Sequence, residues 1–420
     1  MPKVLFISTE FPPAAKSSGV QRILKFVQYL PALGWEPLVL TMHPMAYGES
    51  ISHQPLSSLP KSLLVKRALA FNTSIHFAIK GRYLSWMALP DRWVSWVFFG
   101  FFSGVRFIKR YKPNVIVSSY PHASAHLLAL LLHKVTKVPW VADFRDPMLY
   151  FNEDIQGVRY KIYQWLEAQT IKHCHCAVFT TPSAISQYAK VKFPDYPESK
   201  WHLIENGFDE AVFLDAELLL QKVAKHEGNK ITLLHAGVLY PDERDPCCFF
   251  QAVANLLSSG VIKTGALQII LRAPGNELSY QIAINELGLQ DIILIKPQLN
   301  YIEALAEMLS VDGLLVFQGA NCNVQVPAKV YEYFRAKKPI FALTDSAGDT
   351  ASLLRSAGID NIAALDNAAQ ITALLGVFLQ RLNLGEPSIA TSSFVTAQSR
   401  KSRAVQLADV LSVCVKTGTQ

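Results

Sequence analysis

The sequence predicts an α/β protein with two doubly wound domains, each a parallel sheet covered by helices. Short apolar runs rich in β-forming residues alternate with longer helical patterns, which is typical of parallel sheets built from βαβ units. The alternation occurs twice, with a break near the middle of the chain. The length of 420 residues also fits two domains of about 200 residues better than one.

The first series begins with a strand at residues 4–8, a helix at 19–33 and a strand at 36–41. Gly34 follows the helix, where glycine favours a left-handed helix end. The remaining predicted strands of this series are 115–118, 140–143, 177–181 and 202–204. Asn206 then introduces a polar stretch, so we expect the interdomain linker around residues 205–230.

The second series begins at Ile231 and has the short connections that βαβ units require. Its predicted strands are 231–236, 267–272, 292–295, 313–317 and 340–343, and its predicted helices are 246–258, 278–287, 301–309 and 328–336. We therefore predict Rossmann-like domains over residues 1–205 and 206–395, with a helix at about 400–420 packing back on the first. Such domains predict a cleft lined by the carboxyl ends of both sheets, where these folds bind ligands.

Composition limits the function classes. With 50% hydrophobic and 17% charged residues the chain is expected to fold rather than to be disordered. The net charge of +7 is too dilute for nucleic acid binding, but it suits anionic small molecules or an anionic membrane surface. The six cysteines lack C-x-x-C spacing, so we expect reduced thiols in a cytosolic protein, and no metal-ligand cluster is evident. We expect no signal peptide and no membrane span, because the most apolar segment, 93–105, has 13 residues.

Residues 61–112 combine many Lys and Arg residues with Trp and Phe. This combination suits an interfacial helix that meets a lipid-linked acceptor at the inner face of a cell membrane. An ordinary pair of core helices in the first domain is the alternative interpretation.

Two loops of the first domain carry candidate site residues. Ser17, Ser18 and Gly19 open the first helix, where backbone N–H groups can approach an anion closely. The alternative is a plain turn capped by Ser17 or Ser18. In the second loop, Asp143 and Asp146 flank Arg145 just after a strand, where these charges can orient an acceptor hydroxyl or hold donor groups. The alternative is a structural ion-pair network.

In the second domain, Gly237 ends a strand and Arg244 precedes the next helix. A guanidinium there matches a diphosphate in geometry and charge. The alternative is a surface arginine paired with Asp242 or Asp245.

A second feature of this domain is the helix predicted over residues 328–336. Pro327 suits the first position of that helix, whose N–H groups form an anion pocket together with Lys329. Glu332, one turn further on, can accept two hydroxyls of a ribose. Its alternative is an ordinary solvated helix residue.

These pieces, in this order, resemble the family-four type retaining glycosyltransferases of the GT-B fold, closest to the bacterial branch that builds cell-surface polysaccharides and lipopolysaccharide. The likeness covers essentially the whole chain. It rests on the opening K-V-L-F-I-S-T-E-F-P-P, P-W-V-A-D-F-R-D-P, I-E-N-G-F-D, G-x-L-Y-x-x-x-R-D-P and V-P-A-K-V-Y-E-Y-F-x-A-K-K-P-I. It implies an N-terminal acceptor domain and a C-terminal domain for a nucleotide sugar, with Arg244 on the diphosphate and Glu332 on the ribose. Gly19 and its neighbours are expected to approach the phosphates or the transferred sugar.

The candidate residues fall into three groups. For chemistry we predict Arg244, Lys329, Asp143 and Arg145. For the donor nucleotide sugar we predict Ser18, Gly19, Gly237, Arg244, Arg272, Val326, Pro327, Ala328, Lys329 and Glu332. For sugar or acceptor contacts we predict His122, His126, Asp146, Asn323 and Gln325.

The chain departs from the family pattern at three places. Val324 stands where the first of two paired glutamates is usual, and no lysine follows Arg244 closely. The usual histidine after the fourth strand is replaced around Ser118–Tyr120, with His122 and His126 nearby. The predicted activity is retaining transfer of a sugar to an acceptor hydroxyl without a metal ion. A nucleotide-sugar epimerase on the same scaffold and an inactive nucleotide-binding homologue are the alternatives.

Overall fold

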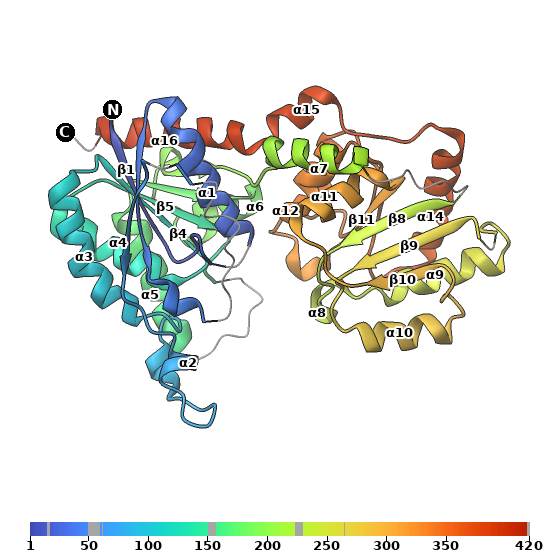
Figure 1. The fold of residues 1–420 in the computed structure, drawn as a ribbon, viewed down its shortest axis with the longest axis horizontal. Coiled ribbons are helices and arrows are strands. Elements are labelled where there is room, and N and C mark those ends of the chain that lie inside the picture. The colour runs from blue at the N-terminus through green and yellow to red at the C-terminus, as the bar shows by residue number, and fades with distance from the viewer. Residues whose placement is uncertain are drawn as a thin grey trace. The chain divides into compact units, whose positions relative to one another are not determined.

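The computed structural model describes residues 1–14, 17–48, 59–60, 62–149, 157–222, 230–263 and 265–417. It divides into two compact units, one of Met1–Asn206 with Arg400–Gln420 and one of Gly207–Ser399 (Figure 1). Each unit holds one parallel sheet with helices on both faces, which confirms the predicted fold class of two Rossmann-like domains. The cleft between the two domains stays a prediction from that fold class.

The first unit is a seven-stranded sheet in the order β3-β2-β1-β4-β5-β6-β7. Its strands are β1 (Lys3–Ser8), β2 (Glu36–Met42), β3 (Leu64–Ala68), β4 (Val115–Ser119), β5 (Trp140–Arg145), β6 (Cys176–Phe179) and β7 (Trp201–Leu203). Its helices are α1 (Ser18–Tyr29), α2 (Thr73–His76), α3 (Ser95–Tyr111), α4 (Ala123–Thr136), α5 (Gly157–His173), α6 (Pro182–Ser186) and α16 (Arg400–Thr417).

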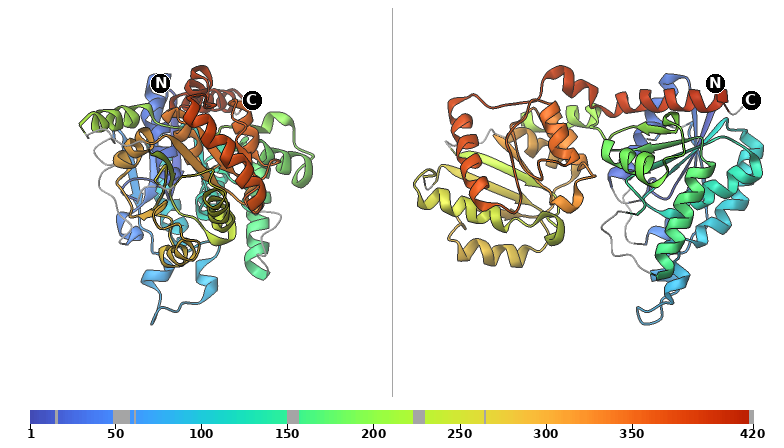
Figure 2. Two further views of the ribbon diagram at one scale, coloured as in Figure 1. Left: turned by 90° about the vertical axis from the view of Figure 1, so that its right-hand side faces the viewer. Right: turned by 180° about the vertical axis from the view of Figure 1, so that it is seen from behind.

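Alternation along β1 builds the two faces of this unit. Leu5 and Ile7 pack under α3 and α4, whereas Val4 and Phe6 pack under α1 and α16. The C-terminal helix α16 therefore lies beside α1 and completes the core of the N-terminal domain, as Figures 1 and 2 show.

The second unit is a six-stranded sheet in the order β10-β9-β8-β11-β12-β13. Its strands are β8 (Ile231–Ala236), β9 (Leu267–Arg272), β10 (Ile293–Lys296), β11 (Gly313–Phe317), β12 (Ile340–Leu343) and β13 (Ile362–Ala363). Its helices are α7 (Glu210–Lys222), α8 (Pro241–Arg244), α9 (Cys247–Ser258), α10 (Glu277–Glu286), α11 (Tyr301–Ser310), α12 (Ala328–Ala336), α13 (Asp349–Ser356), α14 (Ala368–Leu384) and α15 (Ser392–Ala397).

Three local features differ from the sequence expectations. The helix expected to reach residue 33 ends at Tyr29, because Pro31 lies at the start of a 3₁₀ turn over Leu30–Leu33. The edge strands β3 and β13 were not predicted, since β3 carries Lys66 and Arg67 and β13 has only two residues. The segment expected as interdomain linker contains helix α7, which packs on α11 and so belongs to the second unit, while residues 223–229 lie outside the described part.

Within the described ranges, none of the helices has the length and apolarity needed to cross a membrane.

Candidate active site

The strongest cationic feature of the second unit lies where β8 ends and α12 begins. Lys329 occupies the first turn of α12, and its Nζ lies 3.3 Å from Nε2 of His235 on β8. His235 is fully buried, and its Nδ1 donates to the carbonyl of Leu315 at 3.0 Å. A neutral ring that donates through Nδ1 has an acceptor at Nε2, so His235 holds the lysine ammonium by a charge-assisted hydrogen bond.

Burial makes this lysine sensitive to a bound anion. The pKa of Lys329 is lowered to about 7, mainly by desolvation and also by the charge of Arg244, while Glu332 opposes the shift. Burial also holds the pKa of His235 well below its usual range, so the ring stays neutral. Gly237 has φ of +116°, and a Cβ there would lie 3.0 Å from Lys329 Nζ. The glycine therefore leaves the space that the lysine head occupies.

Arg244, the last residue of α8, contacts only one of the carboxylates beside it in the sequence, and that one at long range. Its Nη1 donates to the carbonyl of Val238 at 3.3 Å, and its ion-pair partner is Glu243 at 3.9 Å rather than Asp242 or Asp245. Its Nε is buried without a hydrogen-bond partner among the described residues. A buried, unsatisfied guanidinium N–H is poised to donate to an anionic ligand.

Glu332 lies one turn beyond Lys329 on α12. The flanking Tyr331 and Tyr333 are fully buried in the core, so the carboxylate belongs to the less buried side of the helix. Its Oε1 accepts from the hydroxyl of Tyr301 at 2.6 Å, at the start of α11. Sequence reasoning missed Tyr301, because the contact joins residues 31 positions apart and no local pattern marks it.

The other donor-side residues have mainly structural contacts. Arg272 donates to both carboxylate oxygens of Glu307 and to the carbonyl of Pro297 at 2.8 Å, and only 8% of its surface is exposed. This pairing occupies the guanidinium that we predicted for the donor. Asn323 Nδ2 donates to Asp345 at 2.6 Å.

The stretch before α12 differs in one detail from the expectation. Pro327 occupies the N-cap position instead of the first helical position, which belongs to Ala328. Val326 packs against the core, and the backbone carbonyl of Gln325 accepts from Gln318 at 2.9 Å and Thr350 at 3.1 Å. These bonds fix the loop that delivers Lys329.

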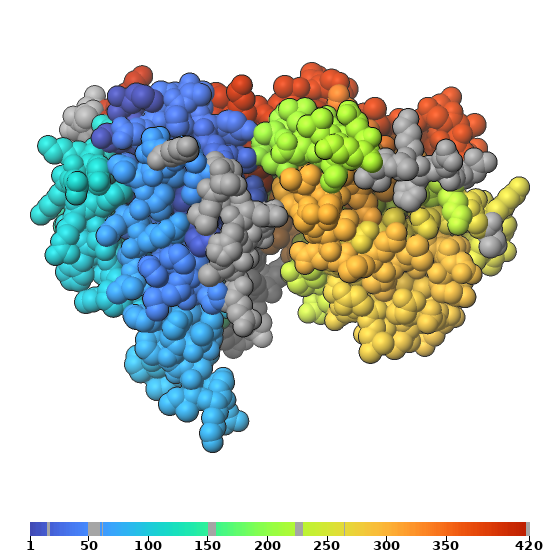
Figure 3. All heavy atoms as spheres, viewed as in Figure 1, coloured from blue at the N-terminus to red at the C-terminus, as the bar shows by residue number. Residues whose placement is uncertain are grey.

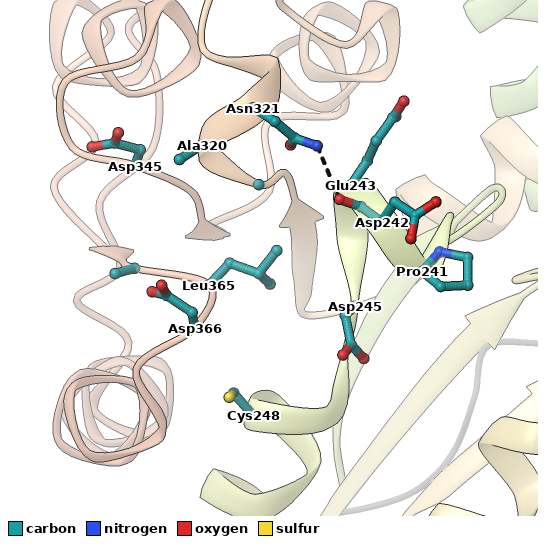
Figure 4. Close-up of a pocket in the computed structure, with 12 residues that line it drawn as sticks. Pro241, Asp242, Glu243, Asp245, Cys248, Ala320, Asn321, Asp345, Leu365 and Asp366 are labelled. Atoms are coloured by element: carbon teal, nitrogen blue, oxygen red, sulfur yellow. Dashed lines mark hydrogen bonds between the residues drawn. The ribbon is translucent and has the colours of Figure 1, made fainter. Parts of the chain in front are cut away.

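A hollow of about 510 Å³ lies beside this region (Figure 4). Its lining includes the carboxylates of Asp242, Glu243, Asp245, Asp345 and Asp366. Figure 4 shows these carboxylates around the hollow and Asn321 donating to the carbonyl of Asp242, at 2.9 Å. Its negative charge is unfavourable for a diphosphate, and none of the predicted donor residues lines it.

In the first unit, the predicted turn before α1 is held by a carboxylate that sequence reasoning missed. Ser17 is the N-cap, accepting from the amide of Val20 at 3.0 Å, and its hydroxyl donates to Glu10 at 2.7 Å. Glu10 also pairs with Arg145 at 2.6 Å. A Cβ on Gly19 would lie 1.6 Å from Glu10 Oε2, so only glycine leaves room for this ion pair.

Arg145 ends β5 in a left-handed conformation, with φ of +61°. Besides Glu10 it contacts the carbonyl of Tyr120 and the hydroxyl of Ser18, both at 3.1 Å. The guanidinium thus pairs with neither of the aspartates that flank it in the sequence. Backbone strain of this kind gathers at functional sites.

The two aspartates have other partners. Asp143 is buried and bonds Arg22 through both oxygens, at 2.9 and 3.0 Å, and Ser119 at 3.0 Å. The structural ion-pair alternative therefore describes Asp143. Asp146 accepts from Thr180 at 3.2 Å, and burial raises its pKa.

The two histidines after β4 differ in exposure. His122 is half-buried, with Nδ1 2.7 Å from the hydroxyl of Thr9 and its ring 4.3 Å from that of Trp93. Burial lowers its pKa. His126 is fully buried against Phe144 with Nδ1 2.7 Å from Ser118, and burial lowers its pKa to about 3. The structure makes His126 a neutral core residue, which corrects its assignment as a sugar or acceptor contact.

Part of the chain is similar to a known protein family. A family model described as "Glycosyl transferase 4-like domain" matches residues 19–207. This stretch, less than half of the chain, is therefore similar to that domain family. No curated protein matches the sequence. The match covers nearly all of the N-terminal part of the first unit, including Gly19, His122 and Arg145.

Several solved structures share the two-domain fold of this chain. HepE from Anabaena in complex with UDP is similar at 13% identity and a TM-score of 0.68, over 98% of this chain and 100% of that one. The lipopolysaccharide outer core galactosyltransferase WaaB is similar at 11% identity and a TM-score of 0.61, over 98% of this chain and 99% of that one. A UDP-GlcNAc 2-epimerase from Neisseria meningitidis is similar at 10% identity and a TM-score of 0.61, over 98% of this chain and 100% of that one. At such identities the likeness shows the two-domain fold alone.

Proposed function

We propose that this glycosyltransferase moves a sugar from a nucleoside diphosphate sugar to an acceptor hydroxyl, with retention at the anomeric carbon. One observation carries the donor assignment: Lys329, the buried Nε of Arg244 and the N-terminus of α12 belong to one site, in which the two cations disfavour each other's charge. Two cations brought together at a helix N-terminus favour a polyanion such as a diphosphate.

The catalytic task in this proposal is stabilisation of the departing diphosphate. Lys329 and Arg244 supply positive charge where negative charge develops, and His235 holds the lysine in place. Glu332, oriented by Tyr301, is the proposed partner of the ribose hydroxyls. Lys329 comes from α12 and takes the role of the lysine that is missing after Arg244. We further propose that these basic groups replace a metal ion.

The acceptor is assigned to the first unit. His122 and the cluster of Glu10, Ser18 and Arg145 follow β1, β4 and β5, at the carboxyl edge of the sheet, where such folds bind ligands. These side chains offer both donors and acceptors for sugar hydroxyls. A role in cell-surface glycan synthesis, in the cytoplasm and with a glycan or lipid-linked acceptor, is supported by the motif resemblance.

Uridine is the base we propose, because HepE was solved with UDP. The test is a thermal-shift series of the whole protein with UDP, GDP, TDP and their sugars. A ligand that binds the native state raises the melting temperature by mass action. We expect a selective shift with UDP that Arg244→Ala removes and Arg381→Ala, an exposed control on α14, retains. Equal shifts in the wild type and Arg244→Ala would refute the donor assignment.

A second measurement separates a transferase from an epimerase. The purified protein is incubated with the stabilising nucleotide sugar in the absence of any acceptor. An epimerase converts the sugar stereochemistry under these conditions, whereas a transferase leaves that stereochemistry unchanged. A binding-only homologue gives a thermal shift but no transfer when candidate acceptors are added.

A further inference from the structure

The first unit presents an apolar projection that the candidate site does not use. We call residues 71–90 the aromatic finger; it contains α2 and a turn closed by the bridge between Ile79 and Arg82. Figures 1 and 3 show it projecting from the rest of the unit. Ile79 is 79% exposed and Trp86 67% exposed. The other exposed large apolar side chains of the finger are Ile75, Phe77, Tyr83 and Leu84.

The finger is anchored at its base, so the exposure belongs to a defined structure. The amide of Thr73 donates to the carbonyl of Arg92 at 2.9 Å, and its hydroxyl donates to that of Met87 at 3.1 Å. Ser95 exchanges hydrogen bonds with the backbone of Phe71, at 2.9 and 3.0 Å. Large apolar side chains held together in water in this way indicate a binding surface.

Aromatic contacts extend the surface from the finger onto α3. Ring centroids are 5.8 Å apart for Phe77 and Phe71 and 5.9 Å apart for Phe71 and Phe99. The series continues from Phe99 to Phe98 at 5.3 Å and from Phe98 to Phe102 at 5.2 Å. The exposed patch therefore includes the outer side of α3.

The opposite side of α3 belongs to the core. Trp96, Gly100 and Gly104 are buried, and the two glycines face Leu128 and Leu132 of α4. The interpretation of residues 61–112 as core thus describes this side of α3, while the interfacial interpretation stays a prediction for the exposed side, and Lys61 lies outside the described part.

The charge of the side chains around this surface indicates which kind of partner binds it. The exposed basic residues of this surface are Lys80 and Arg82 in the finger, Arg92 between the finger and α3, and Arg106, Lys109 and Arg110 on α3. Between Glu49 and Asp143 the sequence has a single acidic residue, Asp91. That carboxylate is buried and accepts hydrogen bonds from Trp93 and Ser124. A second copy of this chain would bring like charges together, whereas an anionic surface neutralises them.

We propose that the aromatic finger and the outer side of α3 bind the surface of a lipid bilayer that contains anionic lipids. Apolar side chains with Trp and Tyr enter the interfacial region, and Lys and Arg remain at the level of the headgroups. The segment that follows the finger contacts the candidate acceptor site, because Trp93 packs on His122 and Arg92 covers Trp93 at 4.1 Å. A lipid-linked acceptor follows from this contact, and that part rests on the proposed function.

The test is vesicle co-sedimentation of the full chain, with phosphatidylcholine alone and with added phosphatidylglycerol. We expect binding to the mixed vesicles, weakened by salt. Ile79→Asp and Trp86→Asp together should lower the partition coefficient by about tenfold or more. Leu278→Asp is the matched control, since Leu278 on α10 is also 79% exposed. Lys80→Glu with Arg82→Glu should lower the partition coefficient about fivefold or more per residue. Lys222→Glu is the control for the change of charge.

Absence of binding to the mixed vesicles would overturn the proposal, as would equal losses for Leu278→Asp and the finger variants. A dimer that Ile79→Asp dissociates, found in light scattering without vesicle binding, would assign the surface to a second copy instead. The thermal shift with UDP is measured on the same variants. A retained shift without vesicle binding refutes the membrane surface alone, and vesicle binding without any shift refutes the donor site alone.

Discussion

The ammonium of Lys329 and the imidazole Nε2 of His235 lie 3.3 Å apart in the second domain, the histidine fully buried and the lysine half-buried. The histidine is fixed as a neutral acceptor by its bond to Leu315. The lysine is therefore oriented before a ligand arrives, but its charge is only partly compensated. A diphosphate would supply the missing negative charge, and this relationship leads to the first prediction.

Donor binding should depend on pH through Lys329. Its pKa of about 7 in the ligand-free protein will rise when a diphosphate binds, because an opposite charge favours the ammonium form. Affinity for UDP should thus fall by about tenfold per pH unit as the pH rises above 7. Calorimetry in buffers of different ionisation enthalpy should detect proton uptake at pH 8. A pH profile of Lys329→Ala as steep as that of the wild type would contradict this.

The same pKa predicts a stability effect without ligand. Unfolding returns the pKa of Lys329 from about 7 to its ordinary value of 10.5. Between pH 7 and 10.5 the unfolded chain therefore binds more protons at this residue than the folded protein does. The contribution of this residue to the free energy of unfolding therefore rises with pH through that window. Lys329→Met should abolish this part of the pH dependence, as measured by denaturant unfolding of the two proteins at pH 6.5 and 9.

Arg244→Ala should lower kcat/KM by about a hundredfold, because removal of one preorganised charge costs about 3 kcal/mol in the transition state. The buried Nε without a described partner is the structural reason. Steady-state kinetics with the selected donor checks this, with Arg381→Ala as the control. A loss of less than about fivefold would assign Arg244 a peripheral role.

Glycine positions offer a matched pair of substitutions. Gly19→Ala should destabilise the first domain by about 1–3 kcal/mol, because its Cβ collides with the Glu10–Arg145 ion pair. Gly376→Ala lies inside α14, where a Cβ meets Leu256 at an ordinary 3.4 Å. That variant should gain about 0.5–1 kcal/mol. Thermal denaturation of both variants measures the contrast, and similar melting temperatures would argue against the crowding at Gly19.

Sequence patterns predicted the central strands, the position of Lys329 at the start of α12, and the N-cap of α1, because these depend on local periodicity and on turn residues. Side-chain partners were not predictable in the same way. Arg145 is flanked by Asp143 and Asp146, yet it pairs with Glu10 across 135 positions, while Asp143 pairs with Arg22 across 121. The bulge in register between Asp143 and Arg145 turns neighbouring side chains toward different partners.

The burial of individual side chains was the second property that the sequence did not predict. His126 and His122 look alike in the sequence, but only the structure shows that His126 faces the core. Arg272 likewise ends a strand at the site edge, as expected of a ligand contact, and Glu307 occupies its guanidinium.

The measurement that tests the central claim most directly is calorimetric titration of UDP into the wild type and into Lys329→Ala, Arg244→Ala and the control Arg381→Ala. The donor site described above predicts saturable binding to the wild type and to Arg381→Ala, with affinity reduced at least tenfold in the other two. Equal affinity in all four proteins, or no UDP binding to the wild type, would contradict it.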